Sequence, residues 1–340
     1  MSVQRLVNPA EAAEAAQTLS TQRTLSRRLV HRSAISEVFL TDFQSVDENT
    51  FRAAAQLPPR HFYYGDHTAR PATHDPLAVF ESVRQMLLCA MHLQHDAGHD
   101  TKSITATASL EITDPEPLRA AGALDLLLLG DVELAKMYQD TVARVVHRVR
   151  VMVGGRQVGV ITVDTAQRPD PVYQKLRMSH RATPPPLSDT LPADTGGVAP
   201  APWRVGREQA ENVVLENADV TDDAVRARLR VPAAHPSMFE HAQDHVPGPV
   251  MMEAARQAAL LLASGSPGGS PAGFCLRYVD AEYLRFAELD SDITVVTRRL
   301  PEPVDGGQWT ETAFVQQDET VARMRVRLAE AHTGGADDAV

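Results

Sequence analysis

Two stretches of the chain decide its fold: Glu81-Ser82-Val83-Arg84-Gln85 and Glu253-Ala254-Ala255-Arg256-Gln257. They share the pattern Glu-x-x-Arg-Gln, lie 172 residues apart, and each sits inside a strongly apolar segment with helical periodicity. Buried helices normally exclude charge, because a desolvated carboxylate is costly. The same three polar residues in two such helices therefore indicate a duplicated fold with a duplicated polar site.

Three further blocks match in the same order: residues 30–32 with 205–207, 37–40 with 212–215, and 56–61 with 230–235. The offset between the copies drifts only between 172 and 175 residues, as loop insertions produce. Chance similarity of short segments is the alternative, and four ordered matches argue against it.

Composition limits the classes of protein that this chain can represent. Its 340 residues suggest two or three domains and a core that needs no disulfides, so Cys89 and Cys275 are expected as free thiols in a reducing compartment. No secretion signal and no membrane-length apolar run is visible, so we expect a cytoplasmic protein that contacts no membrane. The net charge of -11 argues against nucleic-acid binding but permits acidic partners at local basic patches.

The periodicity predicts one long buried helix in each half, residues 75–94 and 247–264, with strands around it. The expected strands are 37–42, 50–57, 103–112, 124–129, 138–153 and 158–164, then 212–215, 224–231, 276–284, 293–300, 309–316 and 320–329. Gly154-Gly155 is a hairpin signal. The expected organisation is a lead-in (1–29), a first repeat (30–164), a Pro-rich linker (165–203), a second repeat (204–332) and a disordered tail (333–340).

This order of elements predicts an α+β fold in which a curved antiparallel sheet wraps one central helix, the hotdog arrangement, present twice in tandem. Two copies in one chain would form an internal pseudo-dimer, and a homodimer of whole chains stays open.

Glu253, Arg256 and Gln257 share one helix face, and Glu81, Arg84 and Gln85 do the same in the first half. One interpretation is a buried ion pair that fixes the helix orientation. The other is a substrate site, in which arginine binds an anion and a partly desolvated glutamate with a raised pKa acts as a base.

The segment before the second helix contains several residues that could bind a metal or a substrate: His235, His241, Asp244, His245 and Gly248. Its spacing matches no helical zinc pattern, so we expect no metal and no cofactor. A substrate loop is the favoured interpretation, in which Gly248 lets a ligand carbonyl approach the free N–H groups of the helix N-terminus. In the first half Asp75 and Pro76 stand at the corresponding place, where Asp would cap the helix and Pro lacks an N–H, so the halves are not equivalent.

The run His235-Pro236 followed by Pro247-Gly248-Pro249-Val250-Met251-Met252-Glu253 resembles the helix start of hotdog acyl-carrier-protein dehydratases. The catalytic histidine of those enzymes would stand at Phe239, so simple dehydration is disfavoured. A closer resemblance is to the A-factor (γ-butyrolactone) biosynthesis family. It rests on Val30-His31-Arg32, Glu37-Val38-Phe39-Leu40-Thr41-Asp42, His74-Asp75-Pro76-Leu77, Asp244-His245-Val246-Pro247-Gly248 and the two Glu-x-x-Arg-Gln motifs.

That resemblance implies condensation of a β-ketoacyl group, delivered on acyl carrier protein, with dihydroxyacetone phosphate. The ester would cyclise to a phosphorylated butenolide, a precursor of signalling lactones or furans that control secondary metabolism. The family's glutamates and arginine match Glu81, Glu253 and Arg256, which are expected to be catalytic. The expected substrate-binding residues are Arg84, Gln85, Gln257, Gly248, His61, His235, His241, Asp244 and His245. The alternatives are a non-catalytic ligand-binding regulator and an acyl-thioester dehydratase or thioesterase.

Overall fold

The computed structural model describes residues 14–330 except Ala16, His99, Ala120, 139–140, His180, 193–195, 266–269 and 302–306. The chain divides into two compact units. Unit 1 contains residues 1–59 and 76–182, and unit 2 contains residues 60–75 and 183–340. The segment Arg60–Asp75, which the sequence analysis placed in the first repeat, therefore belongs to unit 2.

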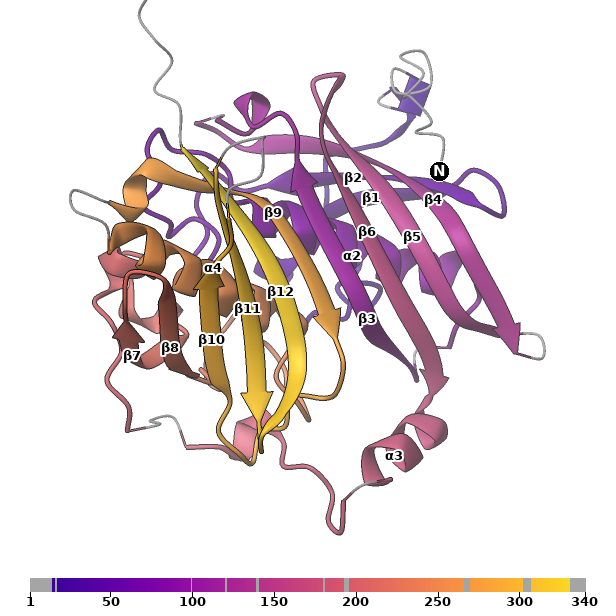
Figure 1. Cartoon of the computed structure of the whole chain (residues 1–340). Helices are drawn as coiled ribbons and strands as arrows, with labels where there is room; N and C mark the ends of the chain where they lie inside the picture. Colours follow the sequence, from indigo (N-terminus) through magenta and orange to yellow (C-terminus); the bar gives the residue numbers. More distant parts are fainter. Residues whose placement is uncertain are drawn as a thin grey trace, which may run out of the picture. The chain divides into compact units, whose positions relative to one another are not determined.

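Unit 1 is an antiparallel sheet with one long helix against it (Figure 1). Its strands lie in the order β1-β2-β4-β5-β6-β3. Their bounds are β1 Leu40–Ser45, β2 Thr50–Leu57, β3 Thr101–Ile112, β4 Leu124–Tyr138, β5 Thr141–Val153 and β6 Arg156–Pro169. The helix α2 runs over Pro76–Leu93, and a second helix, α3, over Asp170–Met178.

Unit 2 repeats this plan around helix α4, Gly248–Ser264. Its strand order is β7-β8-β10-β11-β12-β9, which is the order of unit 1 with each strand number raised by six. The bounds are β7 Leu215–Val220, β8 Ala224–Leu229, β9 Phe274–Tyr283, β10 Thr294–Arg299, β11 Gln308–Gln316 and β12 Glu319–Glu330. The identical order confirms a duplicated hotdog fold.

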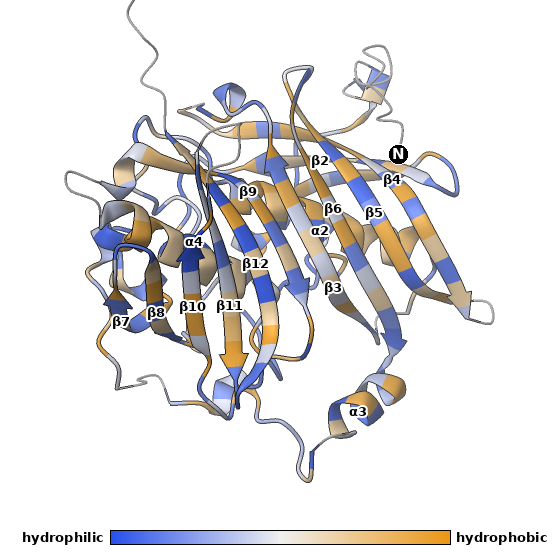
Figure 2. Cartoon of the chain, in the orientation of Figure 1, coloured by the Kyte–Doolittle hydropathy of each residue, from blue (hydrophilic) through white to orange (hydrophobic). Residues whose placement is uncertain are grey.

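Each central helix is buried almost all round, as its apolar composition predicts. Every described residue of α4 from Val250 to Ala263 is buried, and α2 is buried at all but three positions. The strands alternate between hydrophobic and hydrophilic residues instead (Figure 2). In β12 the side chains of Ala322, Met324, Val326 and Leu328 are buried between outward arginines. Gly154 and Gly155 form the predicted hairpin turn, with φ of 55° and 80° that favour glycine.

Several element boundaries were wrong. Residues 165–169, assigned to the linker, continue β6, and 170–178 form α3, because the cross-strand pairing with β3 extends to Pro169. Residues 130–138 extend β4, and the strand expected at 212–215 begins only at Leu215, after a 3₁₀ turn at Ala210–Asn212. The predicted tail, residues 333–340, and residues 1–13 and 16 of the lead-in lie outside the described residues.

Within the described residues, no helix is long and apolar enough to cross a bilayer.

Candidate functional site

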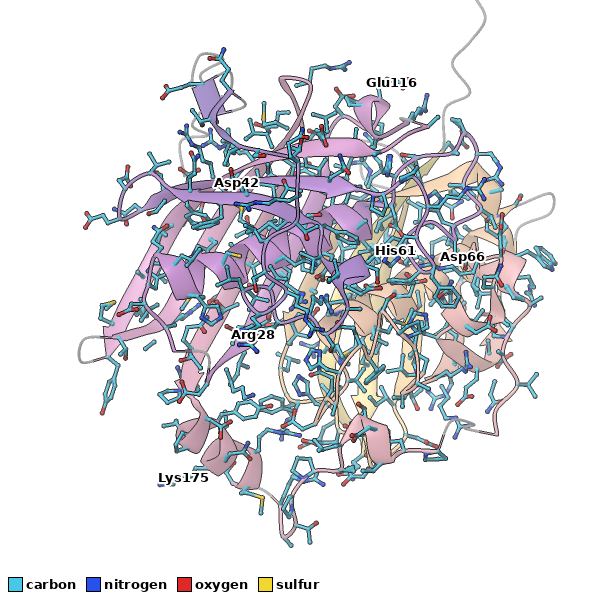
Figure 3. All side chains as sticks on the ribbon, turned by 180° about the vertical axis from the view of Figure 1, so that it is seen from behind. Arg28, Asp42, His61, Asp66, Glu116 and Lys175 are labelled. Atoms are coloured by element: carbon cyan, nitrogen blue, oxygen red, sulfur yellow. The ribbon has the colours of Figure 1, made fainter. Side chains whose placement is uncertain are left out.

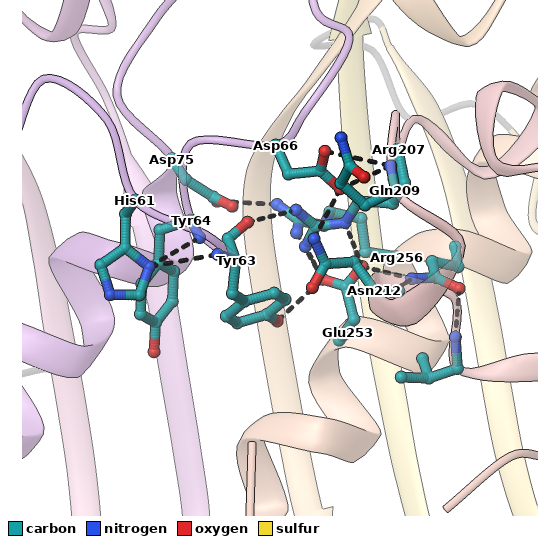
Figure 4. A network of polar contacts seen from close by, with 12 residues as sticks. His61, Tyr63, Tyr64, Asp66, Asp75, Arg207, Gln209, Asn212, Glu253 and Arg256 are labelled. Carbon is teal, nitrogen blue, oxygen red and sulfur yellow. Dashed lines mark hydrogen bonds and ion pairs between the residues drawn. The ribbon is translucent and has the colours of Figure 1, made fainter. Parts of the chain in front are cut away.

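Glu253 lies at the centre of a buried polar network in unit 2 (Figure 4). Its carboxylate has no exposed surface and accepts hydrogen bonds from two residues, Arg207 and Tyr63, besides its helix neighbours. Arg207 binds it through two nitrogens, Nε to Oε1 at 2.9 Å and Nη2 to Oε2 at 2.8 Å. Arg256 forms a short ion pair with Oε2, and the Tyr63 hydroxyl donates to the same oxygen at 3.1 Å. The carboxylate is therefore fully engaged.

The segment 60–75 supplies the partners that the second repeat does not have in its own sequence. Asp75 accepts from Arg256 Nη1 at 2.7 Å, and the backbone carbonyl of Tyr63 accepts from Arg207 Nη1, also at 2.7 Å. The Arg207 guanidinium also lies over the Tyr63 ring, 4.6 Å from its centroid. Two arginines and two carboxylates thus form a cluster without net charge.

Gln257 completes the motif by tying α4 to the backbone beside it. Its Nε2 donates to Glu253 at 2.6 Å and to the Asn212 carbonyl at 2.7 Å, while its Oε1 accepts from the Val214 N–H at 2.9 Å. Because a buried amide needs such partners, this residue is explained by structure alone. Its expected substrate-binding role has no support in these contacts.

The expected raised pKa of the glutamates is wrong. Burial alone would raise the pKa of Glu253, but the neighbouring charges of Arg207 and Arg256 outweigh it and lower the pKa. In unit 1, burial is outweighed in the same way by Arg32 and Arg84, which hold the pKa of Glu81 at about 2. Both carboxylates are therefore ionised at neutral pH and are weak bases.

Unit 1 contains an equivalent set of contacts around Glu81. In each unit we call the two arginines and the glutamine that bind the motif glutamate the clamp. Arg32 forms a short ion pair with Oε1, as Arg207 does with Glu253, and Arg84 Nε lies 2.8 Å from Oε2. Gln85 Nε2 donates to Glu81 at 2.8 Å and to the Glu37 carbonyl at 2.7 Å, as Gln257 does with Asn212. Phe39 N–H donates to Gln85 Oε1 at 2.9 Å. The matched blocks at 30–32 and 37–40 are thus the partners of the motif.

The two clamps differ in ion pairing and exposure. The ion pairs of Arg84 go to Glu81 among the described residues, whereas Arg256 pairs with both Glu253 and Asp75. The Arg84 side chain is 32% exposed, whereas that of Arg256 is 7% exposed and paired twice. Arg84 is therefore the motif arginine better placed to receive an anion.

His61 and His235 stabilise matching turns. Nδ1 of His61 accepts from the N–H groups of Tyr63 and Tyr64, both at 3.2 Å. Nδ1 of His235 accepts from Ser237 and Met238, both at 3.1 Å. Nε2 of His235 must then carry its proton and donate to Asn212 Oδ1, 2.7 Å away. Burial lowers the pKa of His235 to about 4, so this ring is neutral and structural.

His245 is differently placed. Its Nδ1 lies 2.6 Å from Asp244 Oδ1, and an ionised carboxylate can only accept, so Nδ1 carries the proton and Nε2 presents its lone pair. The side chain is 29% exposed, and Nε2 has no hydrogen-bond partner among the described residues. A carboxylate that orients an imidazole with an open Nε2 is the arrangement of a general base.

Gly248 begins α4 three residues later, and Tyr283 lies directly against it. A Cβ at Gly248 would come within 2.7 Å of the Tyr283 hydroxyl, so glycine is required by the phenol and not only by a ligand. No side chain caps this helix end. Burial raises the pKa of Tyr283, which keeps its hydroxyl protonated, and that hydroxyl has no partner in the described part of the chain.

The loop before α4 and the segment after β9 are held together by direct contacts. Val246 N–H donates to the Ala287 carbonyl at 2.8 Å, and the rings of His245 and Phe286 meet edge to face at 5.1 Å. The loop that carries His245 is thus held against the segment after Tyr283, and Tyr283 itself lies against Gly248. His241 lies on the same loop but is bound to Glu240 and Gln243, with 45% of its side chain exposed. Among the described residues, no group of three or more potential ligands could hold a metal.

Comparison with known proteins gives the family. The model of the A-factor biosynthesis hotdog domain matches residues 13–182 and 198–330. The chain belongs to this family. A 2-oxo-3-(phosphooxy)propyl 3-oxoalkanoate synthase of Streptomyces virginiae is 29% identical over 304 residues, which are 88% of this chain and 95% of that protein. A synthase of the same name from Streptomyces coelicolor is 31% identical over 290 residues, 82% of this chain and 83% of that protein.

Solved structures agree on the fold. A candidate oleoyl thioesterase from Lactobacillus plantarum has a TM-score of 0.52 at 11% identity, over 82% of this chain and 96% of that one. A candidate thioesterase from Novosphingobium aromaticivorans has a TM-score of 0.51 at 13% identity, over 85% and 98%. At such identities these likenesses show a shared fold and not a shared reaction.

Sequence reasoning therefore found the members of the A-factor family's two motifs and the loop before α4. It missed Arg207, Tyr63 and Tyr283. The matched blocks 30–32 and 205–207 contained a signal for Arg207, since Arg32 and Arg207 occupy the same place in the repeat. Tyr63 and Tyr283 have no counterpart signal, because each reaches its partner from an element distant in sequence.

Proposed function

We propose that this protein is an acyltransferase that moves a β-ketoacyl group from the thioester of an acyl carrier protein to a hydroxyl of dihydroxyacetone phosphate. The observation that supports it most directly is the match, over most of both chains, to two Streptomyces proteins named 2-oxo-3-(phosphooxy)propyl 3-oxoalkanoate synthase. That name describes an ester of a 3-oxo acid with a phosphorylated three-carbon ketone.

The reaction requires three functions of the protein: a base, hydrogen-bond donors for an oxyanion, and a proton donor for the leaving thiolate. A base takes the proton of the substrate hydroxyl, whose oxygen attacks the thioester carbonyl and forms the new C–O bond. Hydrogen-bond donors stabilise the oxyanion of the tetrahedral intermediate. The C–S bond then breaks, and the proton passes to the leaving thiolate. The ester can next cyclise, when the carbon between its two carbonyls attacks the ketone and water is lost, giving a phosphorylated butenolide.

His245 is the residue best suited to act as the base. Asp244 fixes its Nδ1 proton, which leaves Nε2 to accept the hydroxyl proton and later return it to the thiolate. Neither motif glutamate can do this as easily, because both are saturated with arginine contacts.

The start of α4 offers the donors for the oxyanion. The Gly248 N–H points out of an uncapped helix end, and the positive end of the helix dipole reinforces it. The Tyr283 hydroxyl stands beside it as a second donor. Losing a single donor of this kind costs about 10²–10³ in rate.

The role of the Glu253 network is then to hold α4 in position. Glu253, Arg256 and Arg207 join the helix to segment 60–75, and Gln257 joins it to the backbone at 212–214. The family's catalytic assignments for Glu81, Glu253 and Arg256 are kept here as positioning roles.

The experiment uses purified protein with a β-ketoacyl thioester, with and without dihydroxyacetone phosphate. Thiol release that depends on the triose phosphate, with a phosphorylated product of the expected mass, supports the proposal. His245→Asn is expected to lower kcat about 10²–10⁴-fold, and Tyr283→Phe about 10²-fold, with unchanged thermal stability.

His241→Asn is the matched control, because His241 also contacts an acidic neighbour on the same loop but presents no open nitrogen beside α4. It should retain wild-type kcat. Thiol release without triose phosphate would identify a thioesterase instead, and tight ligand binding without turnover would identify a regulator. Equal activity of His245→Asn and wild type would refute the assignment of the base.

A further inference from the structure

One end of the unit 1 sheet differs from the rest of the chain in charge. The strand pairs Tyr138 with Thr141, Arg144 with Ala166, and Thr101 with Pro169 bring the last residues of β4 and β6 and the first residues of β5 and β3 to the same end. Helix α3 follows β6 directly. We call this region the α3 end: the described residues within 100–104, 133–138, 141–148 and 164–181.

The α3 end is basic in an acidic protein. All three lysines of the chain, Lys102, Lys136 and Lys175, lie in it, on β3, β4 and α3. Its described residues include eight arginines and lysines against four aspartates and glutamates, whereas the whole chain has a net charge of -11. Figure 3 shows Lys175 at the outer side of α3. Such a local field attracts acidic partners that the chain as a whole would repel.

The same end exposes apolar side chains. Val172 and Leu176, one turn apart on α3, are 49% and 44% exposed, and the neighbouring Met178 is 37% exposed. At the end of β4, Met137 and Tyr138 are 57% and 69% exposed. Single exposed apolar residues need no explanation, but apolar side chains on a short helix among lysines have the composition of a protein-docking surface.

The other arginine-rich face is not equivalent. On β12, Arg325 Nε lies 3.3 Å from Glu311, Arg323 stands opposite Glu282, and Arg327 packs over the Trp309 ring. Each outward arginine there has an acidic or aromatic cross-strand neighbour. That face therefore presents alternating charges and no excess of positive charge.

We propose that the α3 end docks an acidic helical protein, with Lys102 and Lys175 pairing with its carboxylates and Leu176 contacting an apolar side chain on it. This rests on the proposed function, under which the partner is the acyl carrier protein that delivers the β-ketoacyl group. Exposed apolar side chains beside the charges favour a protein surface over a nucleic acid.

The test compares two donors that carry the same acyl group, one on acyl carrier protein and one on N-acetylcysteamine. Lys175→Glu is expected to raise KM for the carrier-bound donor about 10-fold at low salt, with a smaller effect at high salt. The kcat/KM for the N-acetylcysteamine donor should not change, because that donor has no docking surface. Arg323→Glu makes the same charge change on the exposed face of β12 and is expected to leave both donors unaffected.

Binding of the carrier protein is measured separately by fluorescence anisotropy, which keeps the docking proposal testable if no donor is turned over. Weaker binding by Lys175→Glu than by Arg323→Glu supports the docking surface even if the proposed reaction fails. Equal binding by the two variants overturns it, even if the reaction is confirmed. Self-association of the wild type that Leu176→Asp abolishes would also overturn it, because the occupant would then be a second copy of the chain.

Discussion

Glu81→Gln is the sharpest test of the clamp. The substitution keeps the size and hydrogen-bonding capacity of the side chain but removes the charge that faces Arg32 and Arg84. The pKa of Glu81 is held at about 2 against an ordinary value of 4.5, and this difference corresponds to about 3 kcal/mol at neutral pH. Removing one partner of a buried pair costs a similar amount, about 3–5 kcal/mol. Unit 1 should therefore lose about 3 kcal/mol.

The pH dependence follows from the sign of the shift. A carboxyl whose pKa is lowered in the folded protein stabilises it fully above pH 4.5 and loses that effect as the pH falls toward 2. The wild type should therefore approach the stability of Glu81→Gln between pH 4.5 and 2, whereas at pH 7 the variant should melt about 6–12 °C lower. Thermal unfolding followed by circular dichroism across this range measures both effects.

The control is Glu111→Gln, an exposed position on β3, which should change the melting temperature by no more than about 1–2 °C. A loss of less than about 1 kcal/mol for Glu81→Gln at pH 7 would refute the argument, since it would mean that the arginine contacts do not compensate the burial of the carboxylate. So would a difference between variant and wild type that stays constant from pH 7 to pH 2.

Two further predictions each rest on a single contact. Gly248→Ala should lower kcat at least about 10-fold with little loss of stability, because its Cβ would displace the Tyr283 hydroxyl; steady-state kinetics on a folded variant checks this. Gly130→Ala should destabilise unit 1 by about 1–3 kcal/mol, because its Cβ would lie 2.6 Å from the Phe51 ring, and Phe51→Leu in the same chain should restore much of it in urea unfolding.

The fold could be predicted because its signals are local and repeated. The two apolar helices, the alternation in β12 and the Gly154-Gly155 turn can each be recognised from neighbouring residues alone, and the two helices with the Glu-x-x-Arg-Gln pattern support each other as copies. Element ends were less predictable. β6 continues to Pro169 because β3 pairs with it that far. The polar sequence of residues 165–169 does not reveal this cross-strand pairing, so the end of the strand could not be predicted from it.

The candidate site was only partly predictable for a different reason. The motif residues were found, but their charge state was not, because the pKa of Glu253 depends on Arg207, which is 46 residues away in sequence. His245 was one of several histidines until the structure showed Asp244 at Nδ1 and an open Nε2. Tyr283 lies in an ordinary strand pattern and is distinguished only by its contact with Gly248.

The two repeats have the same motif but different loops, and this difference explains how one copy can be specialised. Segment 60–75 of the first repeat belongs to unit 2, which also holds the second repeat's own loop, 235–247. Tyr63 and Asp75 from the first loop close the clamp around Glu253 and Arg256, and the second loop contributes Asp244 and His245. Unit 1 does not contain this loop and keeps its own clamp of Arg32, Arg84 and Gln85 around Glu81. The two units therefore share one strand order, but segment 60–75 gives unit 2 contacts that unit 1 does not have, and under the proposed function unit 2 is the unit that carries the chemistry.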